Sequence, residues 1–401
     1  MLYREDQKNG GSLSQLGFGC MRFPRKGVAI DLGKSAEMVK LAIESGVNYF
    51  DTAYIYPGNE AALGQILSGG LREKVNIATK MPLFLVRSEK DFDKFFAQSL
   101  ENLKTDHIDY YMLHMLTDFG YFDKVRSLGA TEWMTKEKER GRAKNMGFSF
   151  HGSYASFTKI IDAYPWDFCM IQYNYLDENH QAGTAGLKYA HSKGLPVIVM
   201  EPLRGGKLAS GLPEVAKREF LAVEAERTPA DWALRWILNH PEVNVVLSGM
   251  GRPEELVQNI ETASIAKAGA MSAEELAAVA KVAQIMRANI KTECTGCGYC
   301  MPCPAGVDIP EAFSRLNEGV LLKRFHIIKN YMMSAGVLAE KPGFASQCKK
   351  CGKCERHCPQ GIKIMETLVE ARKYLQPFWV KAVAALLRGF TIGGVKNKNK
   401  V

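Results

Sequence analysis

Short β-rich runs alternate with amphipathic helical stretches through the first 270 residues of the chain. Eight of these runs have the length and apolar content of strands, and helical patterns separate them. The expected strands are residues 16–20, 48–53, 75–81, 109–115, 143–148, 168–173, 196–201 and 243–249. Eight strands separated by helices predict an α/β fold, a parallel (β/α)8 or TIM barrel, over residues 1–270.

A doubly wound open sheet is the alternative to a barrel. It would want a glycine-rich GxGxxG turn after the first strand. Gly17 and Gly19 begin such a pattern, but the residues that follow do not complete it. The runs at 196–201 and 243–249 are nearly continuously apolar, as strands covered on both faces are. The barrel is therefore the favoured architecture.

A capping box marks the exit from the barrel. Ser272 and Glu275 have the spacing in which each side chain caps the other residue's backbone N–H, and it predicts a helix to about residue 289. The 44 residues between Cys303 and Cys348 include two more helical patterns. We therefore expect residues 271–375 to form a small, mainly α-helical domain.

Residues 376–401 are expected to form an amphipathic helix and a basic tail. The stretch from Phe378 to Phe390 is apolar on most sides, but Lys381 and Arg388 leave only six uncharged residues between them. Such a segment is too short to cross a bilayer, so no transmembrane segment is predicted. Two interpretations stay open: a helix packed on the rest of the protein, and an interfacial membrane helix.

Eight of the ten cysteines lie in two runs that are typical of iron–sulfur ligands. In two-cluster ferredoxins, three closely spaced thiolates hold one cluster, and the cysteine before a proline ligates the other. This rule predicts two 4Fe-4S clusters, one on Cys294, Cys297, Cys300 and Cys358, the other on Cys348, Cys351, Cys354 and Cys303. The second run has the expected spacing, whereas the first closes with two intervening residues in place of three.

Zinc and disulfides are the competing interpretations of these cysteines. Paired C-x2-C units also bind zinc, but few zinc folds repeat a four-cysteine run that ends in Cys-Pro. Disulfides need an oxidising compartment, and residues 1–8 lack the apolar stretch of a secretory signal. The expectation is a cytoplasmic protein with reduced cysteines.

The positive charge is concentrated at the C-terminal end. Residues 341–401 hold 13 Lys/Arg and 3 Asp/Glu, so their formal charge of +10 accounts for the whole net charge of +9. These cations either offset the negative charge of a thiolate-ligated cluster or form a docking face for an acidic electron carrier such as ferredoxin or flavodoxin. Nucleic acid is not expected as a partner, because no recognition helix or aromatic-basic interleaving accompanies the charge.

Ionisable residues mark three successive strand ends, where barrels place their chemistry. They are Asp51, Lys80 and His114, with Tyr56 in the loop after Asp51. A lysine cation lowers the pKa of a nearby phenol from its usual ~10, and an aspartate keeps that lysine charged. A histidine beside them can orient a carbonyl oxygen. Together they predict a general acid that protonates an alkoxide.

At these residues the chain resembles the aldo-keto reductase superfamily. The runs FDTAYIY at 50–56, ATK at 78–80 and MLH at 112–114 look like the family's motifs. The resemblance implies that Asp51, Tyr56, Lys80 and His114 form the catalytic tetrad, with Tyr56 as proton donor or acceptor. The whole chain resembles a branch that is fused to a C-terminal ferredoxin-like domain with two 4Fe-4S clusters.

The resemblance also implies a bound NADP(H) or NAD(H). It extends to the run GFS at 147–149, to PL at 202–203 and to the segment 248–259. The residues that it places on the cofactor are Ser149, Gln172, Pro202, Leu203, Gly249, Arg252 and Asn259. A flavin is an alternative cofactor, but no flavin motif is evident.

Five residues depart from the family's cofactor pattern, and the first of them is Phe150, which stands where an asparagine is common. Met200 replaces an aromatic residue, and Glu201 brings negative charge close to the pyrophosphate position. Gly249 stands where a 2′-phosphate lysine is common, and Glu255 where an arginine stacks on adenine. Arg252 is either a replacement 2′-phosphate ligand or a solvated loop charge. These departures leave the choice between NADP and NAD open.

Three functions fit the two sites. The favoured one is an oxidoreductase that acts on a small carbonyl or alcohol with a nicotinamide, accompanied by clusters that transfer electrons. The second is a ferredoxin-linked reductase whose electrons reach a barrel-bound substrate through the clusters. The third is a non-catalytic electron-transfer subunit, which the four residues at the strand ends argue against.

Overall fold

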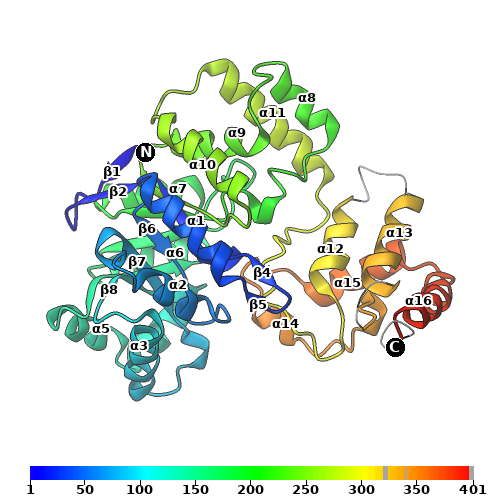
Figure 1. Cartoon of the computed structure of the whole chain (residues 1–401), viewed down its shortest axis with the longest axis horizontal. Helices are drawn as coiled ribbons and strands as arrows, with labels where there is room; N and C mark the ends of the chain where they lie inside the picture. Colours follow the sequence, from blue (N-terminus) through cyan, green and yellow to red (C-terminus); the bar gives the residue numbers. More distant parts are fainter. Residues whose placement is uncertain (319–323, 338, 340, 397–401) are drawn as a thin grey trace. The chain divides into compact units, whose positions relative to one another are not determined.

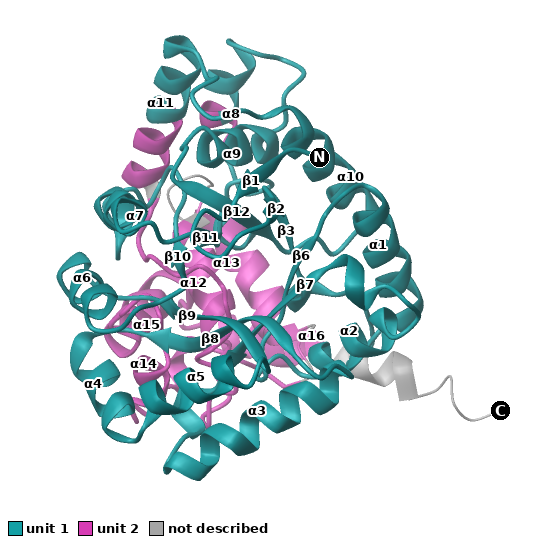
Figure 2. Ribbon diagram, turned by 90° about the vertical axis from the view of Figure 1, so that its left-hand side faces the viewer, with its two compact units in different colours: residues 1–212, 217–281 teal, residues 213–216, 282–401 magenta. Residues whose placement is uncertain are grey.

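The computed structural model describes residues 1–318, 324–337, 339 and 341–396 of the chain. The chain forms two compact units, one of residues 1–212 and 217–281 and the other of residues 213–216 and 282–401 (Figure 2). The first unit contains the strands, and the second is helical (Figure 1). The predicted barrel and the predicted helical domain are both confirmed.

Eight parallel strands close into a barrel in chain order, and all eight were predicted from the sequence. The last strand pairs with the first, Val246 lying opposite Leu16. The strands are β3 (Leu16–Gly19), β6 (Tyr49–Asp51), β7 (Asn76–Met81), β8 (Ile108–Leu116), β9 (Ala143–Phe150), β10 (Phe168–Gln172), β11 (Val197–Met200) and β12 (Val243–Ser248). Their parallel registers bring all eight carboxyl ends to one face of the barrel.

Helices surround the strands in the usual βα order (Figure 2). Side-chain caps start several of them, as where Asp31 accepts from the backbone N–H of Lys34 and Thr228 from that of Asp231. The barrel helices are α1 (Leu32–Glu44), α2 (Asn59–Leu67), α3 (Glu89–Leu103), α4 (Phe119–Ser127), α5 (Ala130–Glu139), α6 (Tyr154–Asp162), α7 (Gly183–Ser192), α8 (Glu214–Leu221), α9 (Pro229–Leu238) and α10 (Pro253–Ile265).

The barrel interior is a packed core. Buried side chains from alternate strands meet there. The ring centroid of Tyr110 lies 5.2 Å from that of Tyr49 and 5.1 Å from that of Phe168. An antiparallel hairpin, β1 (Tyr3–Glu5) with β2 (Ser12–Ser14), precedes the first barrel strand and adds Leu13 to this core. The sequence had not indicated this hairpin. A second short hairpin joins β4 (Arg25–Lys26) to β5 (Ala29–Ile30).

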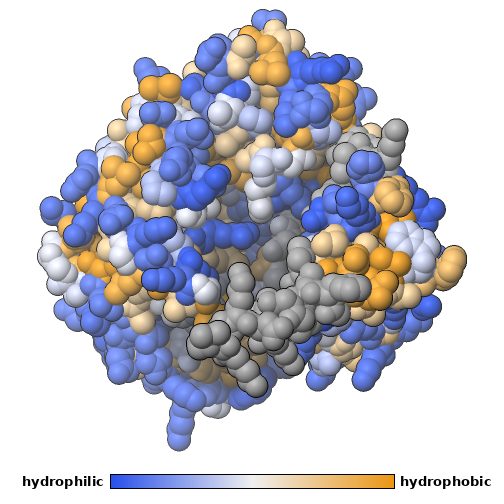
Figure 3. Space-filling view, turned by 45° about the vertical axis from the view of Figure 1, so that its right-hand side comes forward, coloured by the Kyte–Doolittle hydropathy of each residue, from blue (hydrophilic) through white to orange (hydrophobic). Residues whose placement is uncertain are grey.

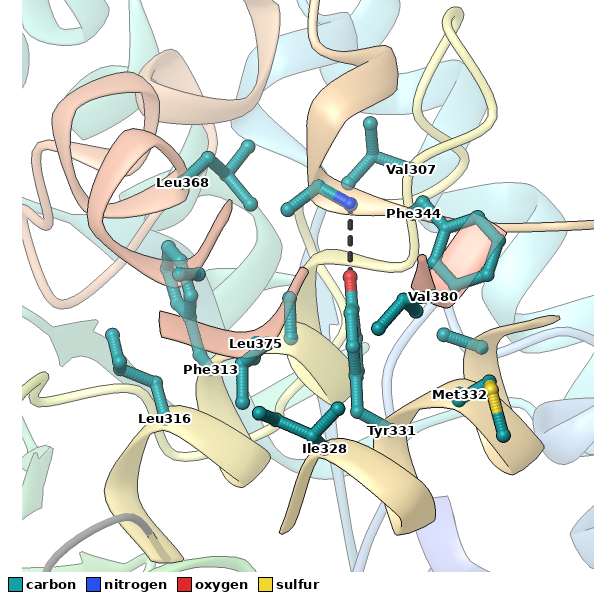
Figure 4. Close-up of a cluster of buried hydrophobic side chains, with 14 of the residues drawn as sticks. Val307, Phe313, Leu316, Ile328, Tyr331, Met332, Phe344, Leu368, Leu375 and Val380 are labelled. Carbon is teal, nitrogen blue, oxygen red and sulfur yellow. Dashed lines mark hydrogen bonds between the residues drawn. The ribbon is translucent and has the colours of Figure 1, made fainter. Parts of the chain in front are cut away.

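The second unit is built from helices around its own apolar core (Figure 4). The predicted capping box is present: the backbone N–H groups of Ser272 and Glu275 each donate to the other's side chain, at 2.7 and 3.1 Å. At the core centre, the Tyr331 hydroxyl accepts from the backbone N–H of Ala345 at 2.8 Å. The helices of this unit are α12 (Ile309–Glu318), α13 (Arg324–Met332), α14 (Lys353–Arg356), α15 (Ile364–Leu375) and α16 (Val380–Lys396), together with the second half of α11 (Ala273–Asn289), whose first half belongs to the first unit.

Helix α16 packs on the second unit through its first turns. Val380 and Ala384 are buried in that unit's core, and Arg388 donates to the carbonyl of Gly336 at 3.0 Å. Phe378, just before the helix, is 97% exposed. The face drawn in Figure 3 shows hydrophobic side chains in small patches among hydrophilic ones. The end of the predicted basic tail, residues 397–401, lies outside the described residues.

No helix in the described part of the chain has both the length and the apolar character to cross a membrane.

Candidate active site and cysteine clusters

Three neighbouring strands carry the predicted tetrad to the carboxyl-end face of the barrel. Asp51 is the last residue of β6, Lys80 lies near the end of β7, and His114 lies in the last part of β8. Turns fold the loop after β6 back on itself, since the N–H of Tyr56 donates to Ala53 O at 3.0 Å. The loop thereby holds Tyr56, half-buried, beside the strand ends.

Lys80 lies at the centre of these four side chains. Its ammonium donates to Oδ1 of Asp51 at 2.6 Å and to the backbone carbonyl of Thr52 at 2.6 Å. It also lies 5.3 Å from the centre of the Tyr56 ring. The Tyr56 and His114 rings meet edge to face, with centroids 6.3 Å apart and planes at 83°. The four predicted residues are thus brought together as one group.

Burial makes the Asp51–Lys80 pair sensitive to the loss of either partner. The side chains of Lys80 and Asp51 are only 3% and 8% exposed. Burial raises the pKa of Asp51, while the Lys80 cation and its hydrogen bond act in the opposite direction. Removing either partner of a buried ion pair leaves the other charge uncompensated, which lowers the free energy of unfolding by about 3–5 kcal/mol.

His114 is held in its neutral form. Burial, then the Lys80 cation and then His151 lower the pKa of His114 well below 6.5. A neutral imidazole has one N–H donor and one acceptor nitrogen. His114 is therefore suited to orient an oxygen by hydrogen bonding, and the positive charge of the site belongs to Lys80.

Ser149 stabilises the backbone beside His114. Met115 has a left-handed conformation, with φ of 60°, and the β8–β9 register shifts between Leu113 and Leu116. The Ser149 hydroxyl accepts from the backbone N–H of Met115 at 2.9 Å. Because the Ser149 hydroxyl acts as an acceptor here, its O–H can still donate a second hydrogen bond. Ser149 can therefore support the irregular end of β8 and also bind a cofactor amide.

Gln172 lies in a buried polar network at the ends of β10 and β11. Its amide nitrogen donates to Asp177 Oδ2 at 2.8 Å, and its oxygen accepts from Gln181 at 2.6 Å. Arg204, 1% exposed, lies 3.2 Å from Asp177 through its Nε atom. Asn174 also donates to Asp177, at 2.9 Å. The network fixes the orientation of the Gln172 amide.

The predicted phosphate loop follows β11 as a tight turn. Glu201 and Arg204 both have positive φ, 55° and 48°. Pro202 is buried between them, and the carbonyl of Leu203 accepts from the N–H of Gly206 at 2.9 Å. These left-handed residues keep the loop compact.

The predicted adenosine segment follows β12. The amide of Asn259 donates to the Ser248 hydroxyl at 3.0 Å, so it is tied to the end of the strand. Arg252 is paired with Glu255 at 2.9 Å. A Cβ at Gly249 would lie 2.6 Å from Cγ of Arg22, so the side chain of Arg22 takes up the space beside this glycine.

Four cysteines of the second unit lie around one pocket. One apolar pocket is lined by Cys294, Cys297, Cys300 and Cys358 together with Ile309, Phe313, Ile362 and Ile364. Burial, followed by the three neighbouring thiols, raises the pKa of Cys300 to about 12. Cys303 is among the groups whose charges act on the pKa of Cys354, which burial raises. Cys358 thus lies with the first run, and Cys303 is near a member of the second.

Comparison with known proteins matches each part of the chain to a known family. The profile of the aldo/keto reductase family matches residues 15–283, and a 4Fe-4S dicluster domain matches residues 293–362. The chain belongs to the aldo/keto reductase family. It is an oxidoreductase with a C-terminal 4Fe-4S dicluster domain.

Relatives of this aldo/keto reductase resemble its barrel. An aldo-keto reductase of Mycolicibacterium vanbaalenii is 29% identical over 232 residues, which are 57% of this chain and 77% of that protein. The methylglyoxal reductase YeaE of Escherichia coli is 26% identical over 52% of this chain and 72% of its own length. The holo form of aldo-keto reductase AKR11C1 from Bacillus halodurans has a TM-score of 0.59 and 25% identity, covering 70% of this chain and 96% of its own.

Sequence reasoning missed several polar residues around the reductase site. His151 follows β9 directly, so its place at a strand end was a usable signal. Asp177, Gln181 and Arg204 lie in loops whose folding brings them to Gln172, and no local pattern marks that approach. Arg22 was missed for the same reason.

Buried His151 gives the reductase barrel a testable pH dependence. Burial lowers its pKa from 6.5 to about 4, with smaller effects from Gln181 and His180. Between these two values the unfolded chain binds more protons than the folded one, so stability is complete above pH 6.5 and falls as the pH drops towards 4. His151 alone should remove about 1 kcal/mol of unfolding free energy between pH 7.5 and 5.5.

Urea unfolding at the two pH values, followed by tryptophan fluorescence under anaerobic conditions, measures this loss. We expect His151→Gln to flatten the pH dependence by that amount. His107→Gln, which alters a mostly buried histidine paired with Asp106 outside the tetrad, is the control. An unchanged pH slope in His151→Gln would contradict the assignment of a neutral buried His151.

Proposed function

We propose that the barrel reduces a small carbonyl compound to an alcohol with a hydride from NAD(P)H, and that Tyr56 supplies the proton. The observation that carries the proposal is the position of Lys80, which is bonded to Asp51 and lies 5.3 Å from the Tyr56 ring beside neutral His114. A cation at this distance favours the phenolate left behind when Tyr56 gives up its proton. The same group works in reverse for alcohol oxidation.

Each of the four residues has a separate task in this proposal. Neutral His114 donates a hydrogen bond that orients the substrate oxygen, and the Tyr56 hydroxyl protonates that oxygen as negative charge develops on it. Lys80 stabilises the charge on Tyr56, and Asp51 keeps Lys80 positioned and charged. Burial of the Asp51–Lys80 pair strengthens this effect, since water screens the charges less.

The residues at the ends of β9 to β12 fit a nicotinamide dinucleotide. The Ser149 hydroxyl has a proton to donate, and the fixed amide of Gln172 can pair with a carboxamide. The compact turn at Pro202 and Leu203 and the segment from Gly249 to Asn259 would hold the phosphates and the adenosine. When bound, the nicotinamide supplies the hydride. A flavin has no comparable set of residues in support.

The substrate class follows from the tetrad and from the relatives. One curated relative is a methylglyoxal reductase, an enzyme named for a small dicarbonyl. A small aldehyde or ketone suits a tetrad whose proposed acid is the half-buried phenol of Tyr56. Methylglyoxal is therefore a suitable first probe.

Replacing the proton donor tests the proposed mechanism. We expect Tyr56→Phe to lower kcat/KM for NAD(P)H-dependent methylglyoxal reduction at least about 100-fold, because the general acid is lost while the ring remains. Tyr54→Phe, two residues earlier in the same loop and packed against Phe95, is the matched control and should keep nearly full activity. Full turnover by Tyr56→Phe would contradict the role of Tyr56. Absence of nicotinamide binding, with reduction driven by a reduced ferredoxin instead, would favour the ferredoxin-linked alternative.

We further propose crossed ligation of the two 4Fe-4S clusters in the dicluster domain. Cys294, Cys297, Cys300 and Cys358 would hold one cluster, and Cys348, Cys351, Cys354 and Cys303 the other. The shared pocket of Cys358 with the first run supports the first set. For the second set, Cys303 is close enough to Cys354 for its charge to act on the pKa of that thiol, and the spacing of the run supplies Cys348 and Cys351. Each cluster would then take its fourth ligand from the opposite run.

Double substitutions separate crossed from uncrossed ligation. Cys294→Ala with Cys358→Ala should remove one cluster and leave about four iron atoms per chain after anaerobic reconstitution. Cys348→Ala with Cys358→Ala should remove both clusters. Uncrossed ligation gives the opposite pair of results. Iron and sulfide analysis measures them, and Cys20→Ala, at a buried barrel cysteine, is the control that should retain about eight iron atoms.

The clusters are proposed to exchange single electrons with an acidic carrier protein of the ferredoxin or flavodoxin class. Cys351 is exposed, whereas the other seven candidate ligands are half-buried. Four exposed cations, Lys349, Lys350, Lys353 and Arg356, lie within five residues of it in the sequence. The cluster on Cys351 would accept one electron from the reduced carrier, which is oxidised by one electron. The surrounding positive charge would attract the carrier.

Charge removal tests this docking surface. Substituting Gln at Lys349, Lys350, Lys353 and Arg356 should slow cluster reduction by reduced flavodoxin at least about 10-fold at low salt and flatten its salt dependence. Stopped-flow absorbance of the clusters gives the rate. The control, with Gln at the exposed barrel residues Lys90, Lys94, Lys124 and Lys136, removes the same net charge. Equal slowing in both variants would show that only net charge matters and would contradict a local docking surface.

A further inference from the structure

The start of helix α10 is occupied by a carboxylate of the chain itself. Glu255, the third residue of this 13-residue helix, accepts from the backbone N–H of Gly251 at 2.9 Å through Oε2. Its Oε1 accepts from Arg252 through Nε at 3.0 Å and lies 2.9 Å from Nη2. One carboxylate therefore holds both the loop amide and the nearest cation.

This arrangement matters because the start of a helix is a natural place for a phosphate. Unpaired N–H groups and the helix dipole attract anions there. With Glu255 in place, a phosphate would meet a fixed negative charge. It would also find the Gly251 amide and the Arg252 guanidinium already bonded. A ligand with a phosphate at this point would have to break the contacts of Glu255 with Gly251 and Arg252, and the carboxylate would repel it. Both effects lower its affinity.

Position 249 provides no cation that could bind a phosphate beside Glu255, because it is a glycine. It carries no side chain, and the stem of Arg22 occupies the space that one would need, 2.6 Å from the position of a Cβ. Arg22 itself is an exposed residue. Glu254, next to Glu255 in the first turn of α10, adds a second negative charge. The balance of charge around the loop thus does not favour a dianion.

We propose that Glu255 makes the barrel selective for NAD(H) over NADP(H). The two cofactors differ by the 2′-phosphate on the adenosine ribose. A carboxylate repels that phosphate, whereas it can accept a hydrogen bond from the free 2′-hydroxyl, as acidic residues do in other dinucleotide sites. The inference rests on the proposed function, because it needs a dinucleotide whose adenosine lies along residues 249–259.

Direct binding measurements test this selectivity without turnover. Titration of the full-length holoprotein with NADH and NADPH, followed by nucleotide fluorescence, should give a Kd for NADH at least about 10-fold lower, a difference of about 1.4 kcal/mol. Glu255→Gln should narrow the difference in Kd between NADH and NADPH, and Glu255→Arg should make NADPH the tighter ligand. Glu254→Gln removes the same charge one residue away but keeps the contacts of Glu255 to Gly251 and Arg252, so it should narrow the affinity difference less than Glu255→Gln does.

A competition experiment needs no variant. 5′-AMP should displace NADH from the unmodified protein better than 2′,5′-ADP does, because the two nucleotides differ only by the 2′-phosphate. Tighter NADPH binding that Arg22→Gln abolishes would show Arg22 to be a phosphate ligand and would overturn the inference, leaving the proposed function standing. If the ratio of the Kd values for NADH and NADPH does not change in Glu255→Gln, then Glu255 only caps the helix, and the inference is also wrong. Binding of neither nucleotide would instead defeat the nicotinamide step of the proposed function.

Discussion

The buried ion pair between Lys80 and Asp51 is the interaction on which the candidate active site depends. It joins the ends of two adjacent strands, and its charge reaches the other two members of the tetrad in different ways. The Lys80 cation lies against the Tyr56 ring and helps to keep His114 neutral. One buried positive charge therefore acts on both residues, and burial is the larger influence on the pKa of His114. The barrel supports it, since the parallel register of β6 and β7 determines where the two side chains meet.

The sequence predicted the barrel well because its pattern is local. Each strand is a short apolar run, and the tetrad residues are found by their places at strand ends. The same holds for the capping box at Ser272, which depends on two residues three positions apart. The N-terminal hairpin was missed because β1 and β2 have three residues each, too few to show a period. The domain limits and the individual ligand assignments stay predictions.

The cofactor side was less predictable because its partners are distant in sequence. Gln172 was chosen from a motif, but the residues that orient it come from the loops after β10 and β11. Arg252 had two open interpretations, and its pairing with Glu255 depends on the first turn of α10. The side chain of Arg22 beside Gly249 joins residues more than two hundred positions apart. Such contacts arise from closure of the barrel, which no local pattern describes.

The unequal exposure of the cysteines has a consequence for handling the protein in air. Dioxygen attacks iron–sulfur clusters from solvent, and the thiolate of Cys351 is the one candidate ligand open to solvent. The cluster on the lysine-rich run would degrade first, while the pocket lined by Ile309 and Phe313 would shield the other. Aerobic preparations would then pass through a half-loaded form. Its brown colour and partial iron content would reflect the architecture of the domain rather than incomplete assembly.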